Sequence, residues 1–137
     1  MKLASLIATR NVLVFSLVAE GATAVAVLVA PGLVAALLFG TDVSGAGVAF
    51  GRLIGIALLA LVIACWPGAD AATGTRAAVR AVLVYNVLAA VYLVWLGAAR
   101  APMGILLWPA VLEHSVVALL LWRGMRRDRN APAGARP

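Results

Sequence analysis

The stretch that decides the fold is residues 46–66, AGVAFGRLIGIALLALVIACW, which carries a single charged residue, Arg52. As an α-helix, these 21 residues would be about 32 Å long, close to the roughly 30 Å thickness of the hydrocarbon core of a bilayer. Pro67 and Gly68 follow directly and favour an end to the helix at this point. The stretch therefore predicts a helix that spans a membrane.

Three further apolar blocks of similar length lie at residues 12–30, 77–97 and 102–122. Across the chain, 65% of the residues are hydrophobic, 12% are charged and the mean hydropathy is +1.09. This composition excludes an ordinary soluble domain, which needs far more polar surface. We predict an all-α integral membrane protein, an antiparallel up-down four-helix bundle that forms a single domain over residues 1–122. Residues 123–137 are predicted to form a basic, disordered cytoplasmic tail.

The basic residues set the predicted orientation. With four spans, nine of the eleven Lys and Arg residues lie on the side that holds both termini. Because positive residues gather on the cytoplasmic side, we expect both termini in the cytoplasm and a multi-pass protein of the bacterial inner, or cytoplasmic, membrane. A signal peptide cleaved after Ala24 is the alternative. Glu20 and the apolar run that continues to Ala30 disfavour it.

Small residues and loop composition predict how the helices meet. Gly47, Gly51 and Gly55 recur at every fourth position, a pattern that lets another backbone approach the second helix closely. The partner is either another helix of this chain or a second copy. The connection over residues 31–45 begins with an apolar run, which we interpret as a hydrophobic loop on the headgroups. A short interfacial or re-entrant segment and an extension of the first helix are the alternatives.

Strongly polar side chains lie near the midpoint of every predicted span. Glu20, Asn86 and Glu113 are one residue from the midpoints of their blocks, His114 is two and Arg52 is four. A charged side chain at mid-bilayer costs about 2.5 to 3.5 kcal/mol, so these residues should face inward and meet one another. The predicted buried polar cluster, a candidate ligand or proton site, comprises Glu20, Arg52, Tyr85, Asn86, Glu113 and His114. Ser16, Glu20 and Thr23 form one polar stripe on the first helix.

Two chemical interpretations of this cluster remain open. Its residues either line a pocket or proton path, or form a structural network in which Arg52 neutralises the glutamates. Two acids against one arginine leave an excess carboxylate, which must be protonated or paired with charged His114. Glu113 is the better candidate for the proton, because Pro109 should kink the helix beside it and open a cavity.

Several site classes are disfavoured. Cys65 is the only cysteine and sits among apolar residues, so it is predicted to pack in the interior. No metal is predicted, because adjacent residues such as Glu113 and His114 diverge on a helix. The sequence has no phosphate-binding loop and points to no particular cofactor. The short basic tail is expected to contact anionic lipid, and nucleic acid is not expected as a partner.

Two family resemblances bear on function. The motifs that carry the first are Gly51-Arg52-Leu53, Cys65-Trp66-Pro67, Tyr85-Asn86, Leu107-Trp108-Pro109-Ala110 and Glu113-His114. With these motifs the chain resembles small bacterial four-helix membrane proteins near the DoxX-like group, which implies quinone-dependent oxidoreduction or association with membrane partners. Glu20, in Val18-Ala19-Glu20-Gly21, is also similar to the first-helix glutamate of the small multidrug resistance transporters. That family lacks an arginine like Arg52 in its second helix.

Three functions are therefore considered. The first is a small accessory or scaffold subunit, or a protein that binds lipid or quinone. The second is a proton-coupled small transporter, and the third is an intramembrane enzyme that uses acid/base chemistry on a lipophilic substrate at Glu113 and His114. The expected partners are membrane lipid, a quinone or other lipophilic molecule, and a second copy or a larger membrane complex.

Overall fold

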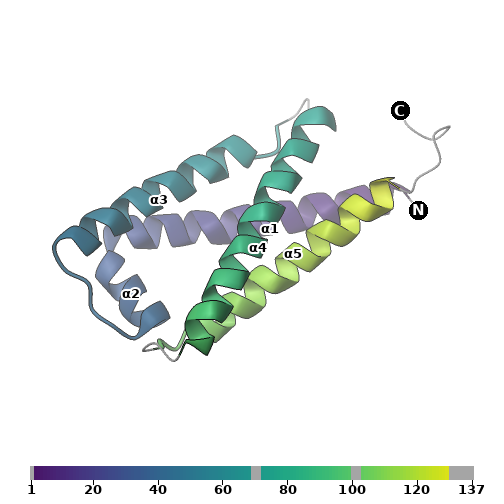
Figure 1. Cartoon of the computed structure of the whole chain (residues 1–137). Coiled ribbons are helices and arrows are strands. Elements are labelled where there is room, and N and C mark those ends of the chain that lie inside the picture. Colours follow the sequence, from purple (N-terminus) through teal and green to yellow (C-terminus); the bar gives the residue numbers. More distant parts are fainter. Residues whose placement is uncertain (1, 69–71, 100–102, 130–137) are drawn as a thin grey trace.

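The computed structural model describes residues 2–68, 72–99 and 103–129, and all regular secondary structure in these ranges is helical (Figure 1). The helices are α1 (Lys2–Val29), α2 (Pro31–Phe39), α3 (Ala46–Cys65), α4 (Ala72–Ala98) and α5 (Leu107–Arg129). Three stretches are long and apolar enough to cross a membrane: Ile7–Val29, Ala46–Cys65 and Thr75–Ala98. The prediction of an all-helical fold is confirmed for the described residues, and three helices have the length and composition that a membrane span requires.

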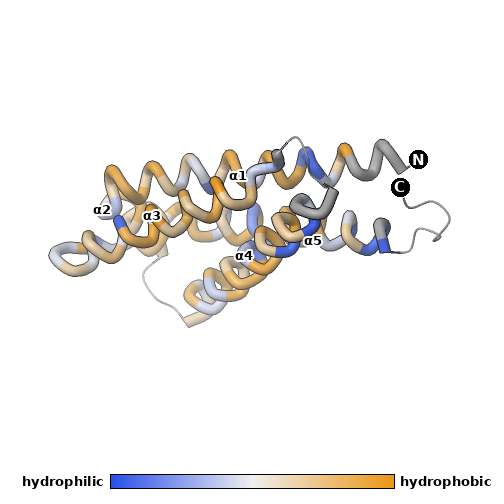
Figure 2. The backbone as a smooth tube through the Cα atoms, turned by 90° about the horizontal axis from the view of Figure 1, so that it is seen from above, coloured by the Kyte–Doolittle hydropathy of each residue, from blue (hydrophilic) through white to orange (hydrophobic). Residues whose placement is uncertain are grey.

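The exterior of the molecule is apolar. Phe15, Ile63 and Leu88 are each more than 60% exposed, and many other large hydrophobic side chains are exposed with them. Figure 2 shows hydrophobic residues along α1, α3 and α4, whereas hydrophilic residues gather toward the end of α5. A soluble protein does not tolerate so much exposed apolar surface, but hydrocarbon does. The surface therefore fits a lipid environment.

The helix α1 is the central element. It contacts each of the other four helices, whereas α3 and α5 do not contact each other. In Figure 1, α1 and α4 run in one direction across the view, and α3 and α5 run in the opposite direction. Gly124 of α5 lies against Thr9 of α1, so the beginning of α1 and the end of α5 lie together. Any site shared by α1, α4 and α5 must therefore lie on the side of α1 away from most of α3.

The apolar segment after α1 forms a separate helix, so its interpretation as a loop is wrong. Ala30, with φ −136° and ψ 62°, leaves the helical conformation, and Pro31 starts α2 at a position where its missing N–H breaks no helical hydrogen bond. Nine residues form α2. The break at Ala30 also excludes a continuous extension of the first helix.

The last helix differs from its predicted span in both bounds. It begins at Leu107, not at residue 102, and it continues to Arg129. Residues 123–129 are therefore helical, which corrects the prediction of a disordered tail there, and residues 130–137 lie outside the described residues. Pro109 is the third residue of α5, in the first turn, where the backbone N–H has no helical partner. The predicted kink beside Glu113 is therefore absent.

Glycines of α3 permit close packing inside the chain. A Cβ at Gly55 would lie 2.8 Å from Leu28 Cγ and 3.0 Å from the Ala24 carbonyl oxygen of α1. A Cβ at Gly51 would lie 2.7 Å from Pro31 Cβ. Gly47 differs, since its nearest neighbour is Val43, in the connection just before α3. The close partner of Gly51 and Gly55 is thus the α1–α2 junction and not a second copy.

The end of α2 is held by the chain that precedes α5. Gly40 ends α2 in the left-handed conformation, with φ +66°. The last carbonyls of a helix lack intrahelical donors. Here Leu38 O accepts from Gly104 N–H at 3.1 Å, and Leu37 O accepts from Leu106 N–H at 2.9 Å. These bonds fix the entry to α5 against α2.

An apolar core lies where the end of α3 meets the beginning of α4. Four helices supply it: Leu13, Leu17, Val62, Cys65, Ala78, Val79, Val82, Val117 and Leu121. Cys65 is buried there and is not paired in a disulfide. Leu17 and Val82 are one helical turn from Glu20 and Asn86, so the core closes one side of the polar residues.

Candidate functional site

Polar side chains from α1, α4 and α5 meet beside this core. We call the group the polar centre. Its members are Ser16 and Glu20 of α1, Tyr85 and Asn86 of α4, and Glu113 and His114 of α5. Ser16 and Asn86 are fully buried, and Glu20 is 3% exposed. Five of the six residues predicted to cluster are therefore together, and Ser16 joins them.

Asn86 organises the polar centre. Its Nδ2 donates to Val82 O at 2.8 Å, one turn back on α4, and to Ser16 Oγ of α1 at 3.3 Å. Because Nδ2 already faces two acceptors, the amide oxygen Oδ1 must face the opposite way. Oδ1 lies 2.9 Å from His114 Nδ1 of α5. One amide thus joins three helices.

The orientation of Asn86 fixes the protonation of one histidine nitrogen. An amide oxygen only accepts, so His114 Nδ1 carries the proton in this hydrogen bond. The same nitrogen lies 3.2 Å from Glu113 Oε2 and 3.5 Å from Glu20 Oε1. The ring of Tyr85 packs edge-on against the His114 ring, with 5.8 Å between the centroids. A single N–H therefore faces three acceptors.

Acceptors outnumber donors in the polar centre. Two donors in the described part of the chain face the glutamates. Tyr85 O–H donates to Glu20 Oε2 at 3.1 Å, and His114 Nδ1–H donates to Asn86 Oδ1 with both glutamates nearby. Among the described residues, the buried Oε1 atoms of Glu20 and Glu113 have no hydrogen-bond partner. A buried acceptor without a donor costs about 1 to 3 kcal/mol, and more when it is charged. A proton on either carboxyl would convert an unpaired acceptor into a donor.

The two glutamates differ in access. The side chain of Glu20 is 4% exposed and that of Glu113 is 31% exposed, with His114 between them at 12%. Glu20 is thus the enclosed acid, and Glu113 lies at the rim of the polar centre. Exposure decreases from Glu113 through His114 to Glu20, so these three side chains lead from the surface of α5 to the interior of the polar centre.

Arg52 does not belong to the polar centre, and its predicted inward position is wrong. It is exposed, and it has no ion pair in the part of the chain that the structure describes. The inward stripe of α3 passes through Gly55, Leu58 and Val62, and Arg52 lies to one side of it. Arg52 is only six residues from the start of α3, about 9 Å, so its long side chain can reach the headgroups.

The geometry also revises the argument against a metal. The donor atoms of Glu20, Glu113 and His114 all lie within 4.8 Å of one another, so neighbouring residues of α5 do converge on Glu20. A metal at Nδ1 would need the lone pair of that nitrogen. In the hydrogen bond to Asn86 Oδ1, Nδ1 carries a proton, so its lone pair is not available to a metal. The arrangement therefore favours shared protons over a metal ion, although the residue types suit both.

Ser16 belongs to the polar centre but was not part of the predicted buried polar cluster. The signal was the stripe of Ser16, Glu20 and Thr23 on one face of the first helix. Thr23 does not join the polar centre, because it is exposed and its Oγ1 donates to the Ala19 carbonyl of its own helix. A hydroxyl that can bond its own helix gives a weaker signal than an amide or a carboxyl.

Asn86→Ala should lower the free energy of unfolding by about 2 to 3 kcal/mol, because it removes three contacts and leaves buried groups unpaired. Ser16→Ala should cost less, about 1 kcal/mol, because Asn86 Nδ2 keeps its bond to Val82 O. Thermal unfolding in mild detergent, followed by circular dichroism, measures both. Val91→Ala, at an exposed position of the same helix, is the matched control and should melt like the parent. Equal melting of Asn86→Ala and Val91→Ala would contradict this role of Asn86.

Comparison with known proteins identifies no relative, since no family model, curated protein or solved structure matches this chain. The resemblance to the DoxX-like group therefore stays a prediction.

Proposed function

We propose that this protein is a four-span membrane protein that binds and releases a proton at the polar centre, as a small proton-coupled carrier. The observation that carries the proposal is the excess of buried acceptors: two glutamates face one shared N–H, and no arginine in the described ranges forms an ion pair with them. Buried titratable groups without a fixed counter-charge are the means by which membrane proteins move protons. The graded exposure from Glu113 to Glu20 supplies a route for exchange.

The topology belongs to the same proposal. We take α5 as the fourth span, because its 23 residues extend about 34 Å, more than the thickness of the hydrocarbon core. Its polar residues Glu113 and His114 face Glu20 and Asn86 rather than lipid. Its last turn is basic, which favours the cytoplasmic side for the end of α5 and hence for the beginning of α1.

Cysteine labelling in a Cys65→Ala background should separate four spans from three. Met103→Cys is expected to react with an impermeant reagent from outside, and Arg126→Cys only after permeabilisation, because α5 lies between them across the bilayer. Asp42→Cys and Gly68→Cys provide outside and inside references. External labelling at both Met103→Cys and Arg126→Cys would mean that α5 does not cross.

Proton binding itself can be measured with a pH-indicator dye in weakly buffered detergent solution. On a shift from mildly alkaline to mildly acidic pH, the parent should take up more protons than the double variant Glu20→Gln with Glu113→Gln. Asp42→Asn, which removes an exposed loop acid, should behave like the parent. Equal uptake by the parent and the double variant, with unchanged helix content, would refute the proposal.

A second function is favoured by one observation, the partial exposure of Glu113. A polar group at the rim, open to the lipid phase, suits an accessory subunit that holds the head of a quinone by hydrogen bonds. A short-chain quinone should then raise the melting temperature of the parent and not that of Glu113→Leu. No shift in the parent would leave proton binding as the only function of the polar centre.

A further inference from the structure

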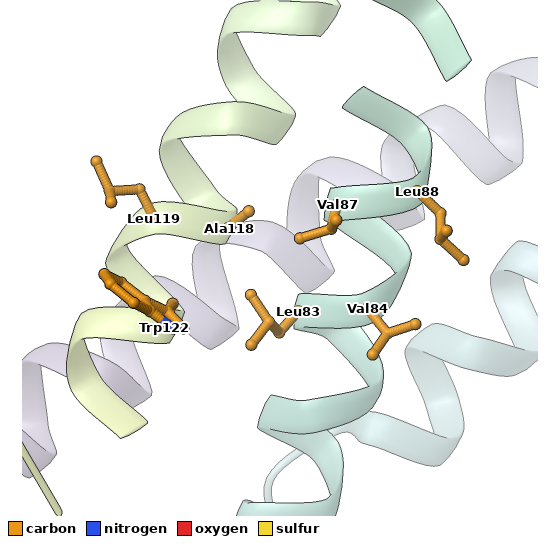
Figure 3. A pocket seen from close by; sticks show the side chains of 7 residues that line it. All are labelled: Leu83, Val84, Val87, Leu88, Ala118, Leu119 and Trp122. Atoms are coloured by element: carbon orange, nitrogen blue, oxygen red, sulfur yellow. The ribbon is translucent and has the colours of Figure 1, made fainter. Parts of the chain in front are cut away.

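A groove lies between α4 and α5 on a different face from the rim of the polar centre. Its volume is about 420 Å³, within the range of ligand sites. Figure 3 shows that its walls are apolar side chains from the two helices. They include Leu83, Val84 and Val87 of α4 and Ala118, Leu119 and Trp122 of α5. Trp122 is nine residues from Glu113, which is half a turn around α5, so the groove does not open onto Glu113.

Two arginines flank one end of the groove. Arg126 lies one turn beyond Trp122, and its guanidinium carbon sits 4.2 Å from the centroid of the Trp122 ring. Arg80 is exposed and lies one turn before Leu83 and Val84, on the same face of α4. Neither arginine has an ion pair with an acid whose side chain the structure describes.

The register of the two helices brings Arg80 close in level to Trp122, the ring that the Arg126 guanidinium lies over. Asn86 meets His114 across the antiparallel pair, so Arg80, six residues before Asn86, is level with Leu120, six residues after His114. That level is about 9 Å from the polar centre along the helix, and Trp122 is about 3 Å further. In the proposed topology this level lies a few Å inside the cytoplasmic headgroups, where Trp is favoured and from which Arg side chains extend to the headgroups.

We propose that the α4–α5 groove binds one acyl chain of an anionic phospholipid of the cytoplasmic leaflet, whose phosphate is held by Arg80 and Arg126. The walls expose only apolar surface, which offers nothing to a quinone head, and the two cations at the mouth complement an anionic headgroup. Arg126 lies over the Trp122 ring, and the N–H groups at the edge of its guanidinium can donate to phosphate oxygens. The inference rests on the proposed topology and not on proton binding.

The test uses the full chain in lipid nanodiscs, with Trp122 as the reporter after Trp66, Trp95 and Trp108 are changed to Phe. A small fraction of phosphatidylglycerol or of phosphatidylcholine carries bromine on its acyl chains and quenches Trp122 on contact. We expect brominated phosphatidylglycerol to quench at about tenfold lower mole fraction than brominated phosphatidylcholine. The double variant Arg80→Gln with Arg126→Gln should remove this preference. Arg10→Gln, which removes an exposed charge of α1, is the control and should keep it.

A groove-filling variant tests the acyl-chain part of the proposal. Val84→Phe, at a position 56% exposed, should weaken quenching by both lipids, and Ile63→Phe, at a 69% exposed position of α3, should not. Equal quenching by the two lipids in the parent, or a preference unchanged in the arginine double variant, would overturn the proposal. Disulfide crosslinking of two copies through Val84→Cys in a Cys65→Ala background would also overturn it, by assigning the groove to a second copy. A wrong topology would appear separately, in the labelling of Met103→Cys and Arg126→Cys.

Discussion

Glu20→Gln is expected to abolish the infrared band of a protonated carboxyl in this protein at neutral pH. The side chain of Glu20 is 4% exposed, and its Oε1 has no donor among the described residues. Burial of an ionised carboxylate is far more costly than burial of the neutral acid. The proton should therefore reside on Glu20, the enclosed acid, and not on Glu113 as the sequence suggested, because Pro109 lies in the first turn of α5 and does not kink the helix beside Glu113.

Companion variants make this assignment specific. Glu113→Gln should keep the band, because the side chain of Glu113 is 31% exposed and can remain ionised at the rim. Tyr85→Phe should keep the band but shift its frequency, since it removes the donor to Glu20 Oε2. Loss of the band only in Glu113→Gln would place the proton at the rim. Absence of the band from the parent would mean that both acids are ionised, and proton storage in the polar centre would be wrong.

Gly104→Val should produce the largest loss of stability of any single change considered, together with loss of the contact between α2 and the start of α5. A Cβ at Gly104 would overlap the Leu37 carbonyl group, which is backbone and cannot rotate away. The two hydrogen bonds that close the end of α2 would break with it. We expect a loss of several kcal/mol, in the range that marks a disrupted backbone contact.

The measurement for Gly104→Val is thermal unfolding in mild detergent together with hydrogen exchange of the amides of Gly104 and Leu106. Both amides should lose protection in the variant. Gly45→Val is an informative comparison, because a Cβ there meets nothing within 4 Å but Gly45 has φ +52°. Its cost should be limited to backbone strain of about 1 to 3 kcal/mol. Parent-like melting of Gly104→Val would show that the α2–α5 contact is dispensable.

The positions of the long helices could be predicted from the sequence because membrane spans obey a length rule. Apolar runs at 12–30, 46–66 and 77–97 correspond to α1, α3 and α4, although α1 and α4 begin before their runs, at Lys2 and Ala72. The start of α5 was misplaced because residues 102–106 are apolar in sequence, but the described part of that segment pairs with α2 by backbone hydrogen bonds. Hydropathy does not report such pairing.

The polar centre was predictable in part, for a physical reason. Depth in the membrane follows from residue number, so Glu20, Asn86, Glu113 and His114 could be assigned to one level. Direction around the helix is harder to predict. Arg52 is nearly at the same level, yet it turns outward, because its long side chain can reach the headgroups and a glutamate cannot.

The division of the polar centre among three helices has a consequence for biosynthesis. Glu20 lies on α1, which leaves the ribosome before α4 and α5, the helices that carry its partners. In the proposed topology, α1 therefore enters the bilayer while these partners do not yet exist. The free-energy cost of a glutamate side chain in hydrocarbon is far lower when it is neutral than when it is charged. We therefore expect Glu20 to enter the membrane already carrying a proton and to become able to ionise only after α4 and α5 have docked.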